Sequence, residues 1–393
     1  MSASILVINA GSSSIKFAVY KLSSQLQKPC INAKIVNIGQ QPQLKIQDEK
    51  DNEIKPDNIT SFAMGATHET LVHWLLSWLS EQDQGFTIKA VGHRVVHGGK
   101  NFTQATLVTP HVIQQLTQLI PLAPLHQAHN LSAIDAIGKW APNLPQVACF
   151  DTSFHHTQDD LATLFAIPRE YTQKGIIRYG FHGLSYDYIA GQLPQHLGKL
   201  AQGRIVVAHL GNGASMCALL NCKSVATSMG FTALDGLMMG QRCGSLDAGV
   251  ILHLLQYYKL SVEDIERLLY KESGLLGVSG ISNNMQVLQK SCAPNAKQAI
   301  NLYCYLAARQ LASLLITING LDAIVFTAGI GEHSALVRQA ICARLAWLGV
   351  ALDEQANQQN KNVISLASSR VKVLVIATNE ELVIAQKTHE LIS

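Results

Sequence analysis

The sequence predicts an α/β fold made of two related halves. Apolar runs typical of strands alternate along the chain with segments whose apolar residues have helical spacing, an order typical of α/β proteins. The 393 residues exceed one ordinary core and suggest two domains. The strand–turn–strand pattern ILVINAGSSSIKFAVY, from Ile5, recurs as IVVAHLGNGASMCALL, from Ile205. An internal repeat of this length indicates two similar α/β units.

The predicted strands are short apolar runs bounded by turn residues, at 5–8, 15–20, 88–96, 147–150, 205–208, 323–327 and 371–377. Helical spacing marks 67–79, 109–120, 301–318 and 335–345. Pro110 suits a first helical turn, and Ser261 followed by two acidic residues is typical of a capped helix start. The polar stretch 40–58 predicts a loop or an edge hairpin.

Composition excludes several classes of protein. The net charge is +3 with both signs mixed throughout, which leaves no electrostatic footprint for nucleic acid or an anionic membrane. The eight cysteines include no C-x-x-C pair, as is typical of reduced thiols, and no apolar run approaches the length of a membrane span. The N-terminal residues lack the cationic region of a signal peptide. We expect a cytoplasmic protein with neither nucleic acid nor membrane as a partner.

The turns of the two repeated hairpins have more hydrogen-bonding groups than a turn requires. Glycines allow close approach of the backbone, and consecutive N–H groups form an anion-binding nest. Lys16 and the hydroxyls of Ser12 and Ser14 suit one side of a phosphate, and Asn212 and Gly213 suit the other. Two such hairpins that face one another would form a phosphate-binding cleft.

A third glycine-rich turn, FTAGIGEHS, follows the predicted strand 323–327 and precedes the predicted helix 335–345. A strand, a glycine turn and a helix in this order suit the ribose and base or the phosphates of a nucleotide. The chain has no G-x-x-x-x-G-K-[ST] motif, and no G-x-G-x-x-G follows a strand. A P-loop is therefore excluded and a dinucleotide site of the Rossmann type is not favoured.

Two arginines lie in apolar, glycine-flanked stretches. Arg94 in VGHRVVHGG and Arg242 in MMGQRCGS present guanidinium forks that match carboxylate and phosphate oxygens, although a lone arginine of this kind also suits a surface ion pair. His182 in RYGFHGLS suits either a core histidine or a donor to a transferring phosphoryl group. Paired arginines favour an anionic acceptor such as a carboxylate, since a sugar hydroxyl would call for a carboxylate base.

Two acidic residues follow predicted strands. Asp151 ends the strand of CFDTSFHH, where α/β sites gather their carboxylates. Glu380 in TNEEL starts a helix, where an acidic residue caps the helix or contributes to a Mg²⁺ site. The histidines near the candidate turns are expected to be structural or supporting residues; they are His93, His97, His126 and His209.

Ten segments in order resemble the acetate kinase family, within the wider group of acetate and sugar kinases, Hsp70 and actin. They are VINAGSSSIK, GHRVVHGG, APLHQAHN, FDTSFH, RYGFHGLSY, HLGNGAS, MGFTALDGL, GQRCG, FTAGIGE and TNEEL. The resemblance implies two actin-like (ribonuclease H-like) α/β domains, 1–150 with 382–393 and 151–381, with a nucleotide cleft between them. It also implies a homodimer.

The resemblance implies a reversible kinase that converts ATP and acetate to ADP and acetyl phosphate. Transfer would be direct and in line, with Mg²⁺, or Mn²⁺ in its place. Asn9 and Glu380 would hold the metal, and Asp151 would orient the metal or the substrate. Arg94 and Arg242 would hold the carboxylate and the transferring group.

The remaining roles implied by the resemblance concern the transferring phosphoryl group, the acyl group and the nucleotide. His182 would stabilise the equatorial oxygens, and Asn212 would contact the γ-phosphate. The acyl methyl would lie in a small pocket lined by Val96, Leu125, Phe181 and Ala233. The nucleotide would contact Ser12, Ser14, Lys16, His209, Gly211, Asn212, Gly213, Asn284, Met285, Gln286, Gly329, Ile330 and Gly331.

The chain departs from the family pattern at four positions. Ala233 stands where proline is common, and a looser acyl pocket would admit propionate, since one methylene is worth only about 1–3 kcal/mol in an apolar pocket. Asn284 and Gln286 replace an aspartate and an arginine near the adenosine, and His333 replaces an asparagine, which bears on nucleotide preference. A propionate kinase, a sugar or polyol kinase and a non-catalytic nucleotide-binding module remain alternatives.

Overall fold

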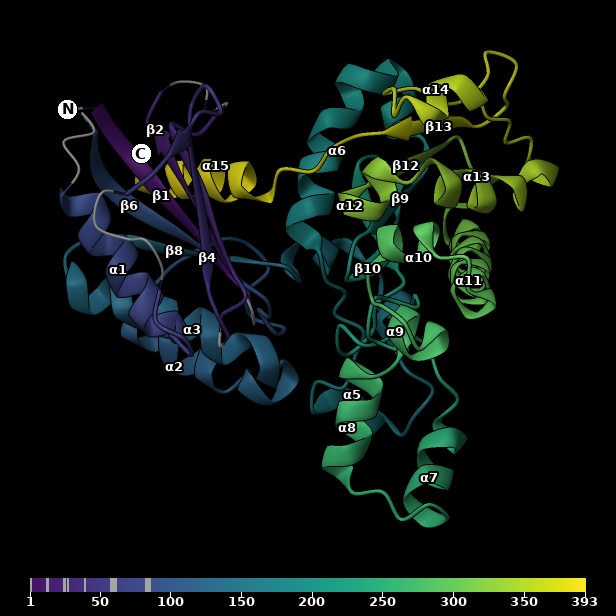
Figure 1. Ribbon diagram of the computed structural model, residues 1–393, viewed down its shortest axis with the longest axis horizontal. Coiled ribbons are helices and arrows are strands. Elements are labelled where there is room, and N and C mark those ends of the chain that lie inside the picture. Colours follow the sequence, from purple (N-terminus) through teal and green to yellow (C-terminus); the bar gives the residue numbers. More distant parts are fainter. Residues whose placement is uncertain are drawn as a thin grey trace. The chain divides into compact units, whose positions relative to one another are not determined.

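The computed structural model describes residues 2–11, 14–23, 26, 28–38, 40–56, 62–81 and 86–393, without the side chains of 81, 124 and 125. The chain divides into two units, Met1–Phe154 with Asn379–Ser393 (unit 1) and His155–Thr378 (unit 2) (Figure 1). The two units meet after residues 154 and 378, a few positions from the boundaries predicted after residues 150 and 381. Asp151 and Glu380 belong to unit 1, because Asp151 directly follows a strand of its sheet and Glu380 starts a helix packed on that sheet.

Unit 1 contains an eight-stranded sheet in the order β5-β4-β3-β2-β1-β6-β8-β7. β1 pairs with β2 in an antiparallel hairpin, and β6 lies parallel to both β1 and β8. The edge hairpin predicted within 40–58 is confirmed as β4 and β5, while 57 and 58 lie outside the described residues. The strands are β1 (Ser2–Ala10), β2 (Ser14–Lys21), β3 (Ile31–Val36), β4 (Gln43–Asp48), β5 (Glu53–Ile54), β6 (Phe86–Val95), β7 (Thr106–Leu107) and β8 (Gln146–Phe150).

Helices cover this sheet. Leu6 and Ile8 of β1 join a buried apolar cluster with Leu71 and Leu75 of α1 (His68–Glu81), because alternate residues of a strand point to the same face. α15 (Glu380–Ile392) lies so close to β6 that a Cβ on Gly92 would be 2.3 Å from Thr388 Oγ1, which explains the glycine. α2 (Pro110–Thr117), the 3₁₀ turn Ile120–Leu122 and α3 (Pro124–Trp140) complete unit 1.

Unit 2 contains a five-stranded sheet in the order β11-β10-β9-β12-β13. β9 and β10 form an antiparallel hairpin, and β12 lies parallel to both β9 and β13. The same pattern occurs in unit 1 as β3-β2-β1-β6-β8, so the internal repeat predicts the shared topology correctly. The strands are β9 (Arg204–Leu210), β10 (Ala214–Leu220), β11 (Lys223–Thr227), β12 (Ala323–Thr327) and β13 (Lys372–Val375).

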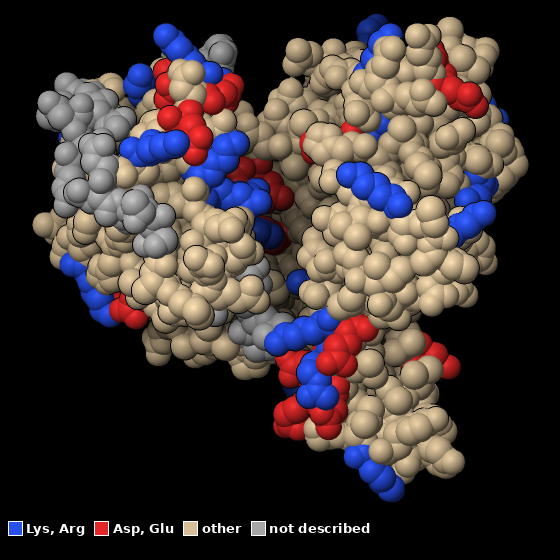
Figure 2. Space-filling view, in the orientation of Figure 1, with Lys and Arg blue, Asp and Glu red and all other residues tan. Residues whose placement is uncertain are grey.

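Helices of unit 2 pack around this sheet. α8 (Val262–Lys271) begins with the predicted cap, since Ser261 and Asp264 form a reciprocal capping box. Charges of both signs are interspersed over this helix in Figure 2. The other helices and 3₁₀ turns, some of them short, are Ser153–Thr157, α4 (Asp160–Thr163), α5 (Arg169–Gln173), α6 (Gly183–Leu197), Gly198–Gln202, α7 (Ala248–Gln256), α9 (Gly274–Ser279), α10 (Met285–Lys290), α11 (Pro294–Ile318), α12 (Ala328–His333), α13 (Ala335–Ala343), Ala346–Leu348 and α14 (Glu354–Gln358).

α11 is the longest helix of unit 2 and starts at Pro294, seven residues before the predicted start at 301. Proline suits the first turn because its missing N–H would be unpaired there. Among the described residues it is the one helix long and apolar enough to cross a membrane, and half of its apolar window is buried. Its buried residues, among them Tyr303 and Leu311, pack in the core of unit 2 against β9, β10 and β11.

Candidate active site

In unit 1 the predicted site residues gather at one end of the sheet. β1, β6 and β8 run parallel, so their carboxyl ends lie at the same edge. Asn9 lies near the end of β1, Arg94 near the end of β6, and Asp151 directly after β8. Glu380 starts α15, which packs against these three strands. The topology therefore places two carboxylates, an amide and a guanidinium at one edge.

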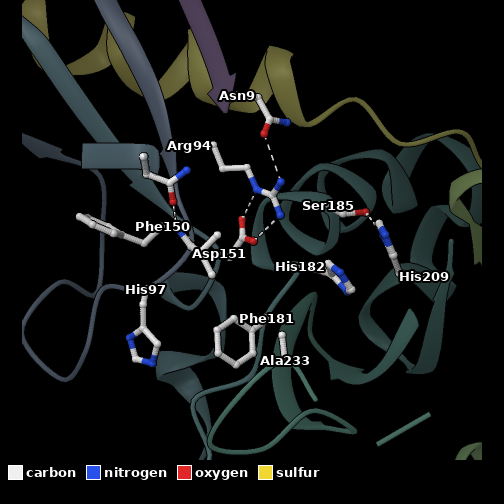
Figure 3. A network of polar contacts seen from close by, with 12 residues as sticks. Asn9, Arg94, His97, Phe150, Asp151, Phe181, His182, Ser185, His209 and Ala233 are labelled. Atoms are coloured by element: carbon white, nitrogen blue, oxygen red, sulfur yellow. Dashed lines mark hydrogen bonds and ion pairs between the residues drawn. The ribbon is translucent and has the colours of Figure 1, made fainter. Parts of the chain in front are cut away.

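Arg94 is held by two neighbours in unit 1. Its Nε and Nη2 donate to Oδ1 and Oδ2 of Asp151 at 2.9 and 2.6 Å, a bidentate pair. Its Nη1 donates to Oδ1 of Asn9 at 3.1 Å (Figure 3). The Asp151 side chain is only 2% exposed, and its backbone N–H donates to Val95 O. Asp151 thus acts in this structure as the group that fixes the Arg94 guanidinium.

Acidic side chains outnumber the bases around Arg94. Burial opposes the charge on Arg94, but Asp151 and Glu380 outweigh it and raise the Arg94 pKa. Burial and the nearby Asp151 and Glu381 carboxylates raise the pKa of Glu380, against the opposing effects of Arg94 and Lys16. Lys16 Nζ lies 3.5 Å from Glu381 Oε1. The sequence analysis missed Glu381, although the paired acids of TNEEL were a visible signal.

This set of residues suits a divalent cation. Among the described residues, the charges that act on Glu380 are those of Asp151 and Glu381 on one side and Arg94 and Lys16 on the other, so the three carboxylates exceed the two cations. The described residues contain no group of three or more His, Cys, Asp or Glu side chains that could hold a metal ion by itself. Mg²⁺ is usually bound by one or two carboxylates together with substrate phosphates, so an incomplete set is what this ion requires. The Asn9 amide oxygen accepts from Arg94 and has a second lone pair available for a metal.

The predicted acyl-pocket residue Val96 is fixed through α3. Its N–H donates to Asn130 Oδ1 at 3.0 Å, and Asn130 Nδ2 donates to Ala10 O at 2.7 Å, which ties β6 to the end of β1. The neighbouring His97 exchanges backbone hydrogen bonds with the Gln127 side chain. The predicted Leu125 side chain and the predicted phosphate contact Ser12 lie outside the described residues, and Ser14 starts β2.

In unit 2 the turn 211–213 joins β9 to β10. Gly211 N donates to Gly213 O at 3.0 Å, which closes the turn. A Cβ on Gly240 would be 2.0 Å from Asn212 Oδ1 and 3.2 Å from Asn283 O, so this turn packs against two other loops. A Cβ on Gly211 would likewise lie 3.7 Å from that of Ala328. The three segments predicted to contact nucleotide, 211–213, 284–286 and 329–331, are therefore neighbours in unit 2.

Asn284 has a local structural role as the cap of α10. Its Oδ1 accepts from Gln286 N at 2.8 Å and Val287 N at 3.4 Å, which explains asparagine at this position. Met285 is buried in the core, whereas Gln286 is exposed. Of the three residues predicted here for nucleotide binding, Asn284 and Gln286 are exposed, and the Asn284 amide oxygen is engaged in the helix cap.

The glycines of FTAGIGEHS do not form the predicted turn. Gly329, Ile330 and Gly331 lie inside α12, and the chain turns instead at Ala328, which has φ 64°. Glu332 Oε1 accepts from Ala328 N at 2.8 Å and from Thr378 N at 3.2 Å. Glu332 thereby stabilises the left-handed residue and allows the helix to start directly after β12. Glu332 is a second acidic residue of the site region that the sequence analysis missed.

His182 precedes α6 in a left-handed backbone conformation, with φ 58°. Such conformations in non-glycine residues cluster at functional sites. Its ring stacks on that of His209, 4.1 Å apart, and a Cβ on Gly213 would lie 3.3 Å from its Nε2 (Figure 3). The preceding Phe181 is buried, and its carbonyl contacts His155 Nε2 at 2.9 Å. Burial lowers the pKa of His155 to about 4, so this ring is neutral and donates to the Phe181 carbonyl.

Arg242 contacts the other predicted acyl-pocket residue of unit 2. Its Nη1 donates to the backbone oxygen of Ala233 at 3.1 Å. Its own carbonyl accepts from Met239 N at 3.1 Å, within the loop that leads to α7. Because the contact uses the backbone of Ala233, it is compatible with proline or alanine at that position. The structure therefore brings Arg242 and Ala233 together, as the resemblance implies for a carboxylate-binding pocket.

Comparisons with known proteins agree with this fold and these residues. A model of the acetokinase family matches residues 4–386. The acetate kinase of Rhodopseudomonas palustris is 51% identical over 391 residues, which cover 98% of both chains, and that of Methylocella silvestris is 43% identical over 394 residues, which cover 99% of this chain and 98% of that one.

Solved structures give the same result. A propionate kinase from Francisella tularensis has a TM-score of 0.91 at 37% identity, covering 99% of this chain and 100% of that one. The acetate kinase of Porphyromonas gingivalis has a TM-score of 0.87 at 33% identity, covering both chains fully. Fold and matches together define an enzyme that transfers phosphoryl groups, built on two actin-like α/β domains. The chain belongs to the acetokinase family. The family resemblance and the fold class predicted from the sequence are confirmed.

Proposed function

We propose that this enzyme transfers the γ-phosphoryl group of ATP reversibly to acetate, giving ADP and acetyl phosphate. The main support is the bidentate contact between Arg94 and Asp151. A sugar or polyol kinase needs a free carboxylate to take the hydroxyl proton. Both oxygens of Asp151 instead accept from Arg94, which leaves this carboxylate poorly placed as a base and its arginine well placed for an anion. An acetate acceptor needs no deprotonation.

The remaining groups supply charge and alignment, which are the main requirements of phosphoryl transfer. Arg94 and Arg242 hold the carboxylate and the transferring group, and His182 donates to the equatorial oxygens during in-line transfer. Lys16 and the N–H groups of the turn 211–213 bind phosphate.

Asn9 and Glu380, with Glu381 close by, would hold Mg²⁺, or Mn²⁺ in its place. The metal ion would supply positive charge that neutralises the phosphate oxygens. The excess of carboxylates around Arg94 supports this assignment. The nucleotide would extend from the turn 211–213 toward Gln286 and α12, because these segments are neighbours in unit 2.

A propionate kinase is the second candidate. The solved structure with a TM-score of 0.91 is named a propionate kinase, and Ala233 leaves the Arg242 contact intact while it offers a small side chain to the acyl pocket. One additional methylene is worth about 1–3 kcal/mol in an apolar pocket, so a single small residue suffices to change the preference between the two acids.

Hydroxylamine trapping of the acyl phosphate tests both functions. The protein is incubated with Mg²⁺ and ATP, and with acetate, propionate, butyrate or glycerol as the acceptor. We expect hydroxamate with the short carboxylates and no ATP consumption with glycerol, and the ratio of kcat/KM values identifies the preferred acid. Consumption of ATP with glycerol alone would overturn the proposal. Product with GTP but not with ATP would support the carboxylate reaction and change only the nucleotide assignment.

We also propose a cytoplasmic homodimer, with α7 in the interface. None of the α7 residues is buried, although its sequence AGVILHLLQ is strongly apolar, and Figure 2 shows mostly uncharged surface there. Leu252 is 54% exposed, and Tyr257 and Tyr258 next to the helix are 72% and 62% exposed. Apolar surface of this extent marks an association site. The eight free cysteines support a reducing compartment.

The mass in solution tests the dimer. Light scattering is expected to give twice the chain mass for the wild type and the single mass for Leu252→Glu. Ile316→Glu on α11, where the isoleucine is 85% exposed, is the matched control and keeps the dimer mass. A monomeric wild-type protein, or a dimer that survives Leu252→Glu, would contradict this interface.

A further inference from the structure

We propose that Ser215 and Tyr186 are positioning residues that hold His182 as the tautomer with its proton on Nε2. The inference deepens the proposed function, because it depends on His182 as the donor to the transferring phosphoryl group. It assigns a role to two buried hydroxyls that need not contact either reactant.

The contacts form a short series of hydrogen bonds within unit 2. His182 Nδ1 lies 2.8 Å from Ser215 Oγ, and the hydroxyl of Tyr186 contacts the same Ser215 oxygen. Ser215 lies on β10 and Tyr186 on α6, and both are completely buried. These hydrogen bonds therefore link the His182 imidazole, at the start of α6, to Ser215 on β10, and Ser215 to Tyr186 in the first turn of α6.

The number of available protons determines which group donates in each of these hydrogen bonds. Burial raises the pKa of Tyr186 well above its usual value, so the phenol keeps its proton and can donate it to Ser215 Oγ. A serine hydroxyl has one proton and two lone pairs, so a Ser215 that accepts from Tyr186 is free to donate to His182 Nδ1. A neutral imidazole that accepts at Nδ1 bears its proton on Nε2.

The protonated nitrogen lies where the reaction needs a donor. A Cβ on Gly213 would be 3.3 Å from His182 Nε2, so this atom lies beside the turn 211–213 proposed to bind phosphate. A fixed N–H donor stabilises developing charge on phosphoryl oxygens because it needs no reorientation during the reaction. The opposite tautomer would present a lone pair to those oxygens.

The stacked partner His209 provides an internal comparison. Its Nδ1 lies 2.8 Å from Ser185 Oγ, and Ser185 donates its proton to Thr378 Oγ1 at 2.9 Å. Ser185 therefore accepts from His209 Nδ1–H, and His209 Nε2 has no proton. The two rings, 4.1 Å apart, thus hold opposite tautomers.

Two titratable groups close to Tyr186 and Ser215, His155 and Cys217, are neutral. The His155 ring meets Tyr186 edge-on at 5.6 Å, and burial lowers its pKa to about 4. Burial raises the pKa of Cys217 on β10 to about 12. Neither group therefore supplies a negative charge that would favour a doubly protonated His182 ring. If both stacked rings, His182 and His209, were protonated, their positive charges would repel each other at this distance.

Nitrogen NMR of the full-length protein labelled with ¹⁵N-histidine tests the proposal. Protonated and unprotonated ring nitrogens have well-separated shifts, and His182→Gln identifies the signals of His182. We expect protonated Nε2 in the wild type. Tyr186→Phe and Ser215→Ala are expected to mix the two tautomers and to lower kcat about tenfold, the effect of one hydrogen bond, with KM for ATP unchanged. Ser185→Ala, the matched control, leaves the His182 signals in place.

A wild-type His182 protonated on Nδ1, or signals that stay unchanged in Tyr186→Phe, would overturn the proposal. Tyr186→Phe removes a single oxygen, so it remains informative if Ser215→Ala does not fold. The NMR result does not depend on activity. A wild-type protein with the expected tautomer but no hydroxamate product would refute the proposed reaction and leave the tautomer assignment standing.

Discussion

Arg94 and Asp151 form a paired, two-bond contact at the carboxyl end of the unit 1 sheet, with N–O distances of 2.9 and 2.6 Å. A second pair of the same geometry, Arg204 with Asp322, lies at the start of β9 in unit 2, far along the strand from the turn 211–213. The two pairs differ in what they hold: the first orients a cation next to other site residues, and the second ties a strand to a loop. This difference provides a matched test.

Asp151→Asn is expected to lower kcat/KM for acetate at least tenfold, because one bond to the guanidinium is lost and Arg94 can rotate. The kcat/KM for ATP should fall less. Steady-state kinetics in the hydroxamate assay measure both values. The control Asp322→Asn should keep wild-type kinetics, and an equal loss in the two variants would show that Asp151 has only a structural role.

Arg242→Ala and His182→Ala are each expected to remove most of kcat while the fold survives, since both side chains are only partly buried. Arg242→Lys should recover little activity, because an ammonium keeps the charge but cannot reproduce the planar fork. Turnover measured beside circular dichroism separates chemistry from folding. Turnover near the wild-type value in Arg242→Ala or His182→Ala would refute the role assigned to that residue.

Gly240→Ala is expected to raise KM for ATP about tenfold, the cost of one displaced contact, because its Cβ would overlap Asn212 Oδ1 and push the turn 211–213 aside. Gly191→Ala on α6 is the control, since a Cβ there has open space. Nucleotide titration of both variants measures the difference. Equal KM values would show that the position of Asn212 does not matter for ATP.

Val96→Ala is expected to raise the propionate-to-acetate ratio of kcat/KM, by about tenfold for a removed apolar contact of this size. Ala233→Pro should lower the same ratio, because the ring narrows the pocket while the backbone oxygen that accepts from Arg242 is retained. Both ratios come from the hydroxamate assay. An unchanged ratio in Val96→Ala would remove this residue from the pocket wall.

Buried histidines predict acid sensitivity. Burial lowers the pKa of His93 and of His155 from 6.5 to about 4. The unfolded chain takes up protons at these sites below pH 6.5 and the folded protein does not, so stability falls as the pH drops from 6.5 to 4, by about 3 kcal/mol per histidine. Urea unfolding between pH 7.5 and 4.5 measures this slope. His155→Gln should reduce the slope, and an unchanged slope would contradict a neutral His155.

Much of the fold follows from local sequence signals. The strand at 323–327 is predicted with its observed bounds, and the cap at Ser261 forms as expected. The repeated hairpin pattern indicates the shared strand order of the two sheets. The predictions omit β3, α3 and α6, because each mixes polar and apolar residues and gains its stability from packing rather than from its own pattern.

The site is less accessible from sequence, because its contacts join residues far apart in the chain. The candidates Arg94 and Asp151 were identifiable by motif, but their pairing across parallel strands was not. Asn284 and Glu332 show that contacts between residues close in sequence can also be missed. Their backbone contacts become visible only once α10 and α12 are formed, so a cap and a turn-stabilising carboxylate cannot be separated from nucleotide ligands by spacing alone.

The discontinuity of unit 1 has a consequence for the order of folding during synthesis. Unit 2 is one continuous segment, 155–378, and can fold as soon as it leaves the ribosome. Unit 1 lacks α15 until residues 379–393 emerge, although its strands were made first. Gly92 on β6 remains uncovered during this interval, and Arg94 has no Glu380 nearby. The edge of unit 1 that holds Asn9, Arg94 and Asp151 is therefore completed only after the whole of unit 2 has been made.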